Sequence, residues 1–531
     1  MPKFLNLELK PSQLWRLGMA LGGGILIGLT PAPINAWPLA WIALVPLWVM
    51  ALQVAKGNHR ERSLLGLVWG IGYHGLAVSW ITGVHPMTWM GVPWLASLAI
   101  ALFCWIFLTL WGAVLAAIWA GCWGWLAQTL KLPFEVRILT GVALWCGLES
   151  FWSWGPLWWT SVSYTQSPHN LAILHLGQLS GPMMITAAIV AVNGLLAEAW
   201  MSYLRSRQGQ ISESRVRKLA IAPFVMAVIL LVGLHLTGWN LYSRALAFPP
   251  EAALKVGIIQ GNIPNEIKLD VQGWRRALDG YTTGYNQLAD QGVAAVLTPE
   301  GALPFLWSGS NLTQSSFYQA VRDRGVVAWV GAFGQKGRSI TNSLFTVLGN
   351  GEVFSRYDKV RLVPLGEYIP FEDVLGRLID RLSPLDAHML PGQTGQLFET
   401  PFGRAIAGIC YESAFAEHFR WQAARGGQFI LSASNDAHYS PAMTAQHHAQ
   451  DVMRAVETDR WVARATNTGY SGVINPHGRT QWLSGLNIYQ LHAVTIYRRQ
   501  TQTLFVRWGD WLTPLLVALA IVLILNSWYH R

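Results

Sequence analysis

Three chemically versatile side chains follow predicted strands or strand-like segments in the second half of the chain. Glu300 follows the apolar run AAVLT, Lys359 lies in YDKVRLVPLGEYIPF, and Cys410 follows RAIAGI. A thiol needs a base to become a nucleophilic thiolate, and attack on a carbonyl needs a positive donor for the oxyanion. A carboxylate, an ammonium and a thiol together therefore fit acyl transfer through a thioester.

Each of these residues also has a purely structural interpretation. Glu300 could be a surface turn residue, Lys359 a surface charge, and Cys410 a core thiol, because free cysteine is usually buried. Cys410 is nevertheless the one cysteine outside the strongly apolar stretches. The others are Cys104, Cys122 and Cys146. The chain contains no CxxC pair and no His/Cys cluster with zinc spacing, so the sequence indicates no metal site.

The composition is typical of a membrane protein. Of the 531 residues, 52% are hydrophobic and 12% are charged, whereas an average soluble domain carries about 25% charged residues. The 29 tryptophans agree with this class, because Trp favours the membrane–water interface. In a soluble protein the net charge of +10 would suggest nucleic acid as a partner. Here we expect basic loops beside anionic lipid, and a membrane rather than nucleic acid as partner.

Eight apolar stretches predict membrane spans, because a spanning helix needs about 20 apolar residues. They are residues 17–34, 37–54, 64–84, 94–126, 138–154, 182–203, 219–239 and 511–528. The fourth is too long for one untilted span, so it tilts or continues into solvent. The predicted organisation is an N-terminal membrane domain (1–240) with about seven spans, an outer domain (241–510) and a C-terminal span (511–531).

The loops between these stretches alternate in charge. Lysine and arginine occur at the N-terminus and in the loops after the second, fourth and sixth stretches, and are absent after the first, third and fifth. The positive-inside rule then places both termini in the cytoplasm and residues 241–510 outside it. The aromatic loop ESFWSWGPLWWTSVSYTQSPHN (149–170) forms either an ordinary interfacial belt or the border of a lipid-entry surface.

Residues 241–510 show strands alternating with helices, which is typical of an α/β domain. The predicted strands are 254–260, 294–298, 326–333, 343–349, 404–409 and 429–434, with a helix at 445–460 and a strand running into a turn at 469–480. Catalytic groups in α/β folds gather beyond the carboxyl ends of strands. Glu300 and Cys410 have that position in the sequence.

The motifs around these residues resemble those of the nitrilase superfamily. They are a PE pair ending in Glu300, the pattern YxKxxLVPxGEYxPF around Lys359, and GxCYE around Cys410. Together with QGNIP, TNS, SNDAHY, RAVETDRW, RATNTGYSGVINPHGR and the multi-span frame, nearly the whole chain resembles the bacterial apolipoprotein N-acyltransferases. The resemblance implies a polytopic α-helical protein of the bacterial plasma (inner) membrane, with an αββα nitrilase-like sandwich on its periplasmic side.

The resemblance also implies a two-step reaction without a cofactor. Glu300 would be the general base, Lys359 the oxyanion stabiliser and Cys410 the nucleophile. A phospholipid, typically phosphatidylethanolamine, would donate an acyl chain to the cysteine. The chain would then pass to the α-amino group of a diacylglyceryl-cysteine at the N-terminus of an apolipoprotein, in the last step of lipoprotein maturation. The residues that match supporting or substrate-binding positions are Asn342, Glu367, Tyr411 and Glu412.

Two other functions fit some of the same residues. A membrane-anchored amidase would use the same trio with water as the acceptor. A transporter or scaffold would use the outer domain only for binding, and Glu149 is then the main ionisable candidate within the spans. The chain also departs from the family at Leu269, Thr298 and His438, where tryptophan is common. These departures leave the acyl-chain and head-group preference open.

Overall fold

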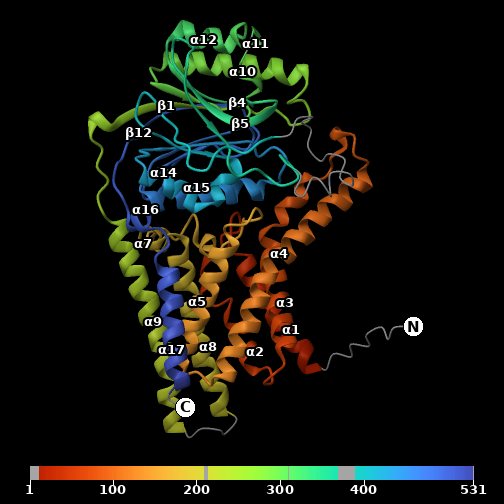
Figure 1. Ribbon diagram of the computed structural model, residues 1–531, viewed down its shortest axis with the longest axis vertical. Helices are drawn as coiled ribbons and strands as arrows, with labels where there is room; N and C mark the ends of the chain where they lie inside the picture. The colour runs from red at the N-terminus through yellow and green to blue at the C-terminus, as the bar shows by residue number, and fades with distance from the viewer. Residues whose placement is uncertain (1–10, 208–212, 309, 369–388, 530–531) are drawn as a thin grey trace.

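The computed structural model describes residues 11–207, 213–308, 310–368 and 389–529. Figure 1 shows a bundle of helices that carries a layered α/β part above it. The basic N-terminal residues Lys3 and Lys10, and the end of the GEYIPF motif (369–371), lie outside the described residues. The elements thus form a helical part and an α/β part, and the predicted domain boundaries at residues 240 and 510 stay a prediction.

The bundle consists of long apolar helices joined by short helical turns. The longer helices are α1 (Pro11–Gly28), α2 (Val45–Gln53), α3 (His59–Ala77), α4 (Trp94–Thr129), α5 (Phe134–Trp152), α8 (Pro182–Arg207), α9 (Glu213–Tyr242) and α17 (Leu512–Tyr529). The short ones are η1 (Trp37–Trp41), η2 (Ser79–Val84), η3 (Thr88–Met90), η4 (Val162–Gln166), α6 (Leu171–Leu174) and α7 (Gly177–Ser180). Although α17 comes last in the sequence, it packs beside α5 in the bundle.

Several of these helices are long and apolar enough to cross a membrane. Within the described residues, length and composition select four: α4, α8, the Ile221–Tyr242 portion of α9, and α17. The exposed side chains of α9 and α17 include many large apolar residues, as expected for surfaces that face lipid. The prediction of helices that are able to span a membrane is thus confirmed for these four, and the total of about eight spans stays a prediction.

Two predicted spans differ in form from a simple crossing helix. Residues 37–54 are divided into η1 and α2, and the nine residues of α2 rise only about 14 Å. Pro38 and Pro46 are the second residues of these two pieces, in the first turn, where a missing N–H costs little. The helix α4, in contrast, has 36 residues and is roughly 54 Å long. Figure 1 shows it inclined and reaching beyond the bundle toward the α/β part.

The α/β part contains two sheets. The seven-stranded sheet has the order β12-β1-β2-β4-β5-β6, with β3 beside β4, and the five-stranded sheet has the order β11-β10-β9-β8-β7. The first comprises β1 (Ala253–Gln260), β2 (Ala295–Leu297), β3 (Leu303–Leu306), β4 (Val327–Lys336), β5 (Ser339–Val347), β6 (Val353–Asp358) and β12 (Gln490–Tyr497). The second comprises β7 (Ile406–Ile409), β8 (Ile430–Ser434), β9 (Val462–Thr466), β10 (Gly472–Ile474) and β11 (Thr480–Leu483).

Helices cover the outer faces of both sheets, so the predicted αββα layering is confirmed. One core between the sheets joins residues such as Ile258 and Trp329 to Leu431. On the far side, α10 (Val271–Asp290) and α12 (Ser316–Arg324) cover the seven-stranded sheet, with α11 (Ser310–Thr313) and η5 (Pro250–Ala252) nearby in the chain. The helices α14 (Ala416–Ala424), α15 (Pro441–Thr458) and α16 (Leu504–Trp508) lie between the five-stranded sheet and the bundle (Figure 1).

The five-stranded sheet, α14, α15 and the bundle share one continuous apolar core. Ile430 of β8 and Val456 of α15 belong to the same buried cluster as Trp48 and Ile189 of the bundle. The α/β part is therefore packed directly onto the membrane part. The aromatic loop 149–170 takes part in this packing, because Trp158 and Trp159 are buried in a cluster with Phe415.

Candidate active site

Four of the predicted site residues meet in one hydrogen-bonded group. Lys359, which follows β6, donates from Nζ to Glu300 Oε1 at 2.8 Å and to Glu367 Oε1 at 3.0 Å. Asn342 in β5 donates from Nδ2 to the same two carboxylates, at 2.7 and 2.8 Å. The backbone N–H of Lys359 also donates to the Asn342 carbonyl at 2.8 Å. One ammonium and one amide thus hold two carboxylates that are distant in sequence.

Because the group is buried, the charge of each member strongly affects the pKa values of the others. Lys359 is 1% exposed. Burial lowers its pKa, but the carboxylates of Glu300 and Glu367 outweigh this and keep the pKa well above the ordinary value. Burial raises the pKa of Glu300, but Lys359 and Lys268 outweigh this effect and lower it overall. For Glu367, burial prevails and its pKa is raised. At neutral pH the lysine is therefore an ammonium and Glu300 a carboxylate.

Cys410 lies at the carboxyl end of β7, where the chain turns sharply. Its backbone φ is 51°, in the left-handed region that residues other than glycine rarely adopt. The 3₁₀ helix η6 (Cys410–Ala414) begins at this residue. A sharp strand-to-helix turn that bears a nucleophile is a known way to present its side chain at the end of a sheet. The cysteine is 5% exposed.

The thiol of Cys410 is electrostatically linked to the lysine group. Burial and the charge of Glu300 raise its pKa well above the ordinary value, although Lys359 acts in the opposite direction. Glu300 Oε2 also accepts the N–H of Asn435 at 2.9 Å, just beyond β8, the strand that pairs with β7. The predicted trio is therefore assembled in one site. At neutral pH the cysteine is a thiol, so a base must remove its proton during attack.

Glu412 and Tyr411 point away from the ammonium. Glu412 is fully buried and accepts the N–H groups of Ile409 at 2.8 Å, Val360 at 2.6 Å and Arg361 at 3.2 Å. The hydroxyl of Tyr357 donates to it as well, at 2.9 Å. Its carboxylate thus joins the turn at Cys410 to the segment that follows Lys359.

Tyr411 connects the same turn to the membrane part. Its hydroxyl donates to the Pro156 carbonyl at 2.8 Å, and its ring lies nearly parallel to that of Trp159, with centroids 6.2 Å apart. The aromatic loop is therefore more than an interfacial belt. Of its tryptophans, Trp154 is exposed, whereas Trp158 and Trp159 are buried beneath the α/β part.

A buried ionic cluster that the sequence analysis did not identify lies beneath the cysteine. His447 on α15 is 2.8 Å from the Cys410 carbonyl through Nε2 and 3.1 Å from Asp436 through Nδ1. Arg464 pairs with Asp436 at 3.2 Å and with Asp451 at 2.7 Å. These residues lie in or near motifs used for the family resemblance, but sequence spacing gives no sign that they meet.

The cluster brings three metal-ligating residue types close to one another. Atoms of Cys410, Asp436 and His447 that are able to bind a metal lie within 4.8 Å of each other. Both ring nitrogens of His447, however, already face oxygen atoms of Asp436 and Cys410, and the second carboxylate oxygen of Asp436 pairs with Arg464. Both ring nitrogens are thus engaged in hydrogen bonds, and this donor set favours hydrogen bonding over metal coordination.

Lys268 is a further site residue that the sequence analysis did not select. It is buried, and its Nζ donates to the backbone carbonyl of Glu300 at 3.2 Å. Burial lowers its pKa to about 8, against the opposing effect of Glu300. The adjacent Leu269 is a departure from the family, but a lysine followed by an aliphatic residue gives no specific signal.

The other two family departures have different surroundings. Thr298 is buried, and its hydroxyl accepts the N–H of Gly331 at 3.0 Å, so it belongs to the packing between β2 and β4. His438 lies near the site: Asn265 Nδ2 is 2.6 Å from its Nδ1, and its ring is 6.1 Å from that of Trp89. Of these two, His438 is the one placed to affect substrate preference.

Glu149, the candidate for a transport function, has a structural environment. Its carboxylate accepts hydrogen bonds from Trp145 Nε1 at 2.9 Å and Thr186 Oγ1 at 2.9 Å. It is also bonded to Ser161 Oγ and to the N–H of Val162. The carboxylate thus joins α5 and α8 to the aromatic loop, and this satisfied arrangement gives no support to an ion pathway.

Comparison with known proteins gives similarities along most of the chain. Residues 255–502 match the family model for carbon–nitrogen hydrolases, and residues 23–195 match the apolipoprotein N-acyltransferase N-terminal domain. A Nostoc protein named apolipoprotein N-acyltransferase is 62% identical, over 93% of this chain and 96% of its own length. A Synechocystis protein of the same name is 48% identical, over 95% of this chain and 98% of its own length.

A more distant relative and a solved structure are also similar. The Pseudomonas aeruginosa protein of the same name is 30% identical, over 87% of this chain and 86% of its own length. Among solved structures, an amidase from Nesterenkonia sp. AN1 is 19% identical and has a TM-score of 0.37. That likeness covers 50% of this chain and 100% of the amidase.

Proposed function

We propose a mechanism for this chain from the premise that it belongs to the apolipoprotein N-acyltransferase family. The chain is an acyltransferase whose α/β part is a carbon–nitrogen hydrolase domain of nitrilase fold. In our proposal it transfers an acyl chain from a membrane phospholipid to the N-terminal cysteine of an apolipoprotein, through a thioester at Cys410. The observation that carries the mechanism is the buried Lys359 held between Glu300 and Glu367, beside the strained turn at Cys410.

The first half-reaction forms the thioester. Glu300 takes the proton of the Cys410 thiol as the sulfur attacks the ester carbonyl of the phospholipid. The carbonyl oxygen becomes an oxyanion, which the ammonium of Lys359 stabilises. When this intermediate collapses, the C–O bond of the ester breaks and the leaving lysophospholipid oxygen takes the proton from Glu300. The products are the acyl-enzyme and a neutral hydroxyl on the lysophospholipid.

The second half-reaction uses the same groups. The neutral α-amine of the diacylglyceryl-cysteine attacks the thioester carbonyl, and Lys359 again stabilises the oxyanion. Glu300 accepts a proton from the attacking nitrogen. As the C–S bond breaks, this proton passes to the Cys410 sulfur, so the products are an amide and the original thiol. The free enzyme is restored without a cofactor.

The supporting residues hold this machinery in place. Asn342 and Glu367 fix the position of the Lys359 ammonium, and Glu367 also contributes negative charge that keeps the lysine protonated. Glu412 fixes the distance between the lysine segment and the turn at Cys410. Tyr411 fixes that turn against the aromatic loop. We therefore assign the catalytic roles to Glu300, Lys359 and Cys410, and supporting roles to the other four.

The proposed setting is the bacterial plasma (inner) membrane. Residues 1–240 would form the membrane domain, residues 241–510 the periplasmic catalytic domain and residues 511–531 the last span, with both termini cytoplasmic. Phosphatidylethanolamine is the proposed acyl donor, and its chain would reach Cys410 from the outer leaflet beside the domain. The direct packing of the α/β part on the bundle supports this route, because it holds the site close to the lipid.

Mass spectrometry after incubation with phospholipid tests the function. The purified protein is mixed with phosphatidylethanolamine vesicles, and we expect an acyl adduct on the Cys410 peptide that hydroxylamine removes. Adding a diacylated lipopeptide should discharge the adduct and give the triacylated product. The Cys410→Ser variant is the control. Release of ammonia from small amides, without acyl transfer to the lipopeptide, would support an amidase instead.

A further inference from the structure

Three backbone carbonyls of the nucleophile turn, defined here as Cys410–Ala414, accept hydrogen bonds from side chains outside the turn. His447 Nε2 bonds the Cys410 carbonyl at 2.8 Å, and Arg454 Nη1 donates to the Ser413 carbonyl at 2.9 Å. The hydroxyl of Tyr164 donates to the Ala414 carbonyl at 2.6 Å. Three side chains thus fix three carbonyls of a five-residue turn.

These three side chains come from two different parts of the molecule. His447 and Arg454 belong to α15 of the catalytic part, whereas Tyr164 belongs to η4 in the aromatic loop of the membrane part. The Arg454 guanidinium also lies 5.9 Å from the centre of the Tyr164 ring. Tyr164 is buried at this junction, 250 residues from the carbonyl that it binds. The membrane part therefore contacts the nucleophile turn directly.

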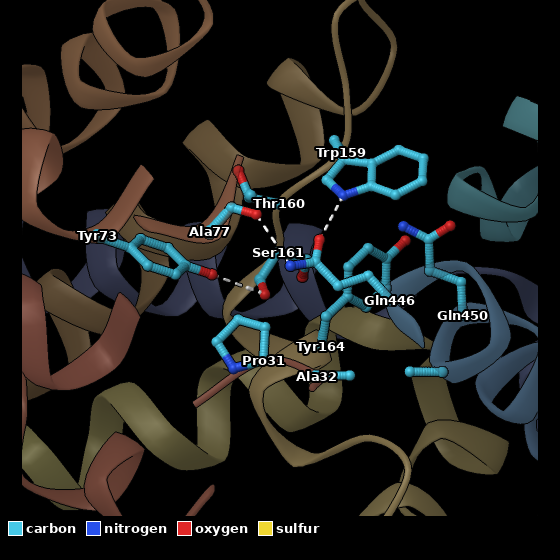
Figure 2. A pocket seen from close by; sticks show the side chains of 11 residues that line it. Pro31, Ala32, Tyr73, Ala77, Trp159, Thr160, Ser161, Tyr164, Gln446 and Gln450 are labelled. Atoms are coloured by element: carbon cyan, nitrogen blue, oxygen red, sulfur yellow. Dashed lines mark hydrogen bonds between the residues drawn. The ribbon is translucent and has the colours of Figure 1, made fainter. Parts of the chain in front are cut away.

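A second connection reaches the turn through α15. Trp159 Nε1 donates to Gln446 Oε1 at 2.7 Å, and Gln446 Nε2 donates to the Ala77 carbonyl at 2.9 Å (Figure 2). Gln446 directly precedes His447, whose ring centroid is 6.0 Å from that of Trp159. The membrane part thus also fixes the residue next to the one that binds the Cys410 carbonyl.

The junction has little free space. A cavity bordered by Tyr73, Trp159, Tyr164 and Gln446, whose side chains are drawn in Figure 2, has a volume of about 20 Å³. About this volume accommodates a water molecule, and an acyl chain needs much more. The junction is therefore a packed contact between two parts of the protein, and this cavity is too small to hold an acyl chain.

Such contacts matter because Cys410 has a strained backbone. A left-handed conformation at a residue other than glycine persists only where its surroundings impose it. Loss of one carbonyl contact would let the turn relax and move the sulfur away from Glu300 and Lys359. A displacement of about 1 Å in an active site lowers the rate by about a hundredfold.

We propose that Tyr164 is a positioning residue for the nucleophile, so that the membrane part sets the geometry of Cys410 as well as anchoring the catalytic domain. The inference rests on the proposed function, in which Cys410 is the nucleophile. Tyr164 touches no reacting atom. It holds the nucleophile turn through the Ala414 carbonyl, and Trp159 supports the same turn through Gln446 and His447.

The test compares two full-length variants that each lose one buried hydroxyl. Tyr164→Phe removes the bond to the nucleophile turn. Tyr73→Phe is the matched control, because the Tyr73 hydroxyl donates to the Ser161 carbonyl at 3.0 Å, inside the membrane part. The probes are p-nitrophenyl butyrate, a water-soluble ester whose burst of p-nitrophenol reports acylation of Cys410, and phosphatidylethanolamine vesicles. Thermal unfolding of both variants is measured in parallel.

We expect Tyr164→Phe to lower the acylation rate constant about tenfold with both probes, because one hydrogen bond corresponds to about that factor. The KM for the soluble ester should stay unchanged, and Tyr73→Phe should acylate at the parent rate. Trp159→Phe, which keeps an aromatic ring but loses the donor to Gln446, should give a smaller loss of the same kind.

Three results would overturn the inference. If Tyr164→Phe and Tyr73→Phe lose acylation rate equally, and their unfolding temperatures fall in parallel, the cause is general destabilisation. If Tyr164→Phe lowers the acylation rate with vesicles but not with the soluble ester, Tyr164 serves lipid access and not the position of Cys410. If the parent protein gives no burst beyond that of Cys410→Ser, the proposed function itself fails, and the inference fails with it.

Discussion

Lys359 and Cys410 follow strands of different sheets and are held by different kinds of neighbour. The lysine half of the site consists of Glu300, Asn342, Lys359 and Glu367, and its main contacts are hydrogen bonds among these four side chains. The cysteine half is held from outside. Its turn depends on α15 and on the aromatic loop of the membrane part.

The difference separates two physical requirements of the reaction. The lysine half must keep opposite charges together in a buried place, and a compact group does most of this, because the ammonium pairs with both carboxylates. The cysteine half must keep a strained backbone in place, which requires rigid neighbours on several sides. The charges of the site thus come from one compact group of side chains, whereas the position of Cys410 depends on the packing of the whole chain.

The largest expected effect comes from removing the nucleophile. Cys410→Ser replaces the sulfur by a much weaker nucleophile in the same space, so we expect acyl transfer to fall below detection. The fold should remain, because the strained turn keeps all of its carbonyl contacts. Transfer of label from phospholipid to a diacylated lipopeptide measures the first point, and thermal unfolding the second. Near-normal turnover would refute the assignment of Cys410.

Removing the central charge should have almost as large an effect. Lys359→Ala deletes the proposed oxyanion donor, and loss of one such donor costs about 10²- to 10³-fold. It also leaves Glu300 and Glu367 buried without their ammonium, so we expect thioester formation to be undetectable and thermal stability to fall.

Lys336→Ala is the matched control, because Lys336 is exposed on β4 and its Nζ contacts only a backbone carbonyl, that of Pro391, among the described residues. Accumulation of acyl-enzyme at the parent rate in Lys359→Ala, followed by mass spectrometry, would disprove the oxyanion role.

Glu412 links the two halves, so its substitution should have an intermediate effect. Glu412→Gln keeps the shape but places an amide among N–H groups that need an acceptor. We expect acylation to fall about ten- to a hundredfold, because unsatisfied buried donors are costly, and the unfolding temperature to fall as well. Glu417→Gln, on the exposed side of the same segment, is the control. Equal activity in both variants would show that the link does not set the rate.

The pH dependence should be the smallest effect. The lowered pKa of Glu300 keeps the base ionised down to pH values below the ordinary 4.5, and the raised pKa of Cys410 keeps the thiol protonated at neutral pH. If Glu300 removes the proton during attack, the acylation rate changes little between about pH 6 and 8.

If preformed thiolate were the reacting species, the rate would instead rise about tenfold per pH unit. Burst kinetics with p-nitrophenyl butyrate across this range distinguish the two. Glu300→Gln should show the steep rise at a low absolute rate, because only preformed thiolate then reacts. A steep rise in the parent protein would remove Glu300 from its role as base.

The layered fold was predictable in outline. Continuous apolar runs predicted β1, β2, β4, β5, β7 and β8, and the helix predicted at 445–460 overlaps most of α15. Short or partly exposed strands were missed, as for β12, whose residues are mostly half-buried and give no clear alternation. The apolar stretch 37–54 was predicted as one span, because composition reports burial in an apolar medium and not where prolines divide a helix.

By itself the sequence determined the family and the reaction class, and it predicted which groups react. Glu300, Lys359 and Cys410 lie in short local motifs, and a motif is a property of neighbouring residues. The tertiary structure alone decided what holds these groups. The contacts of Tyr164 with Ala414, and of Trp159 with Gln446, join residues more than 200 positions apart, and no local pattern encodes such a meeting. Packing decides where these residues lie in space. The strained backbone at Cys410 and its contacts with the membrane part are therefore visible only in the folded chain.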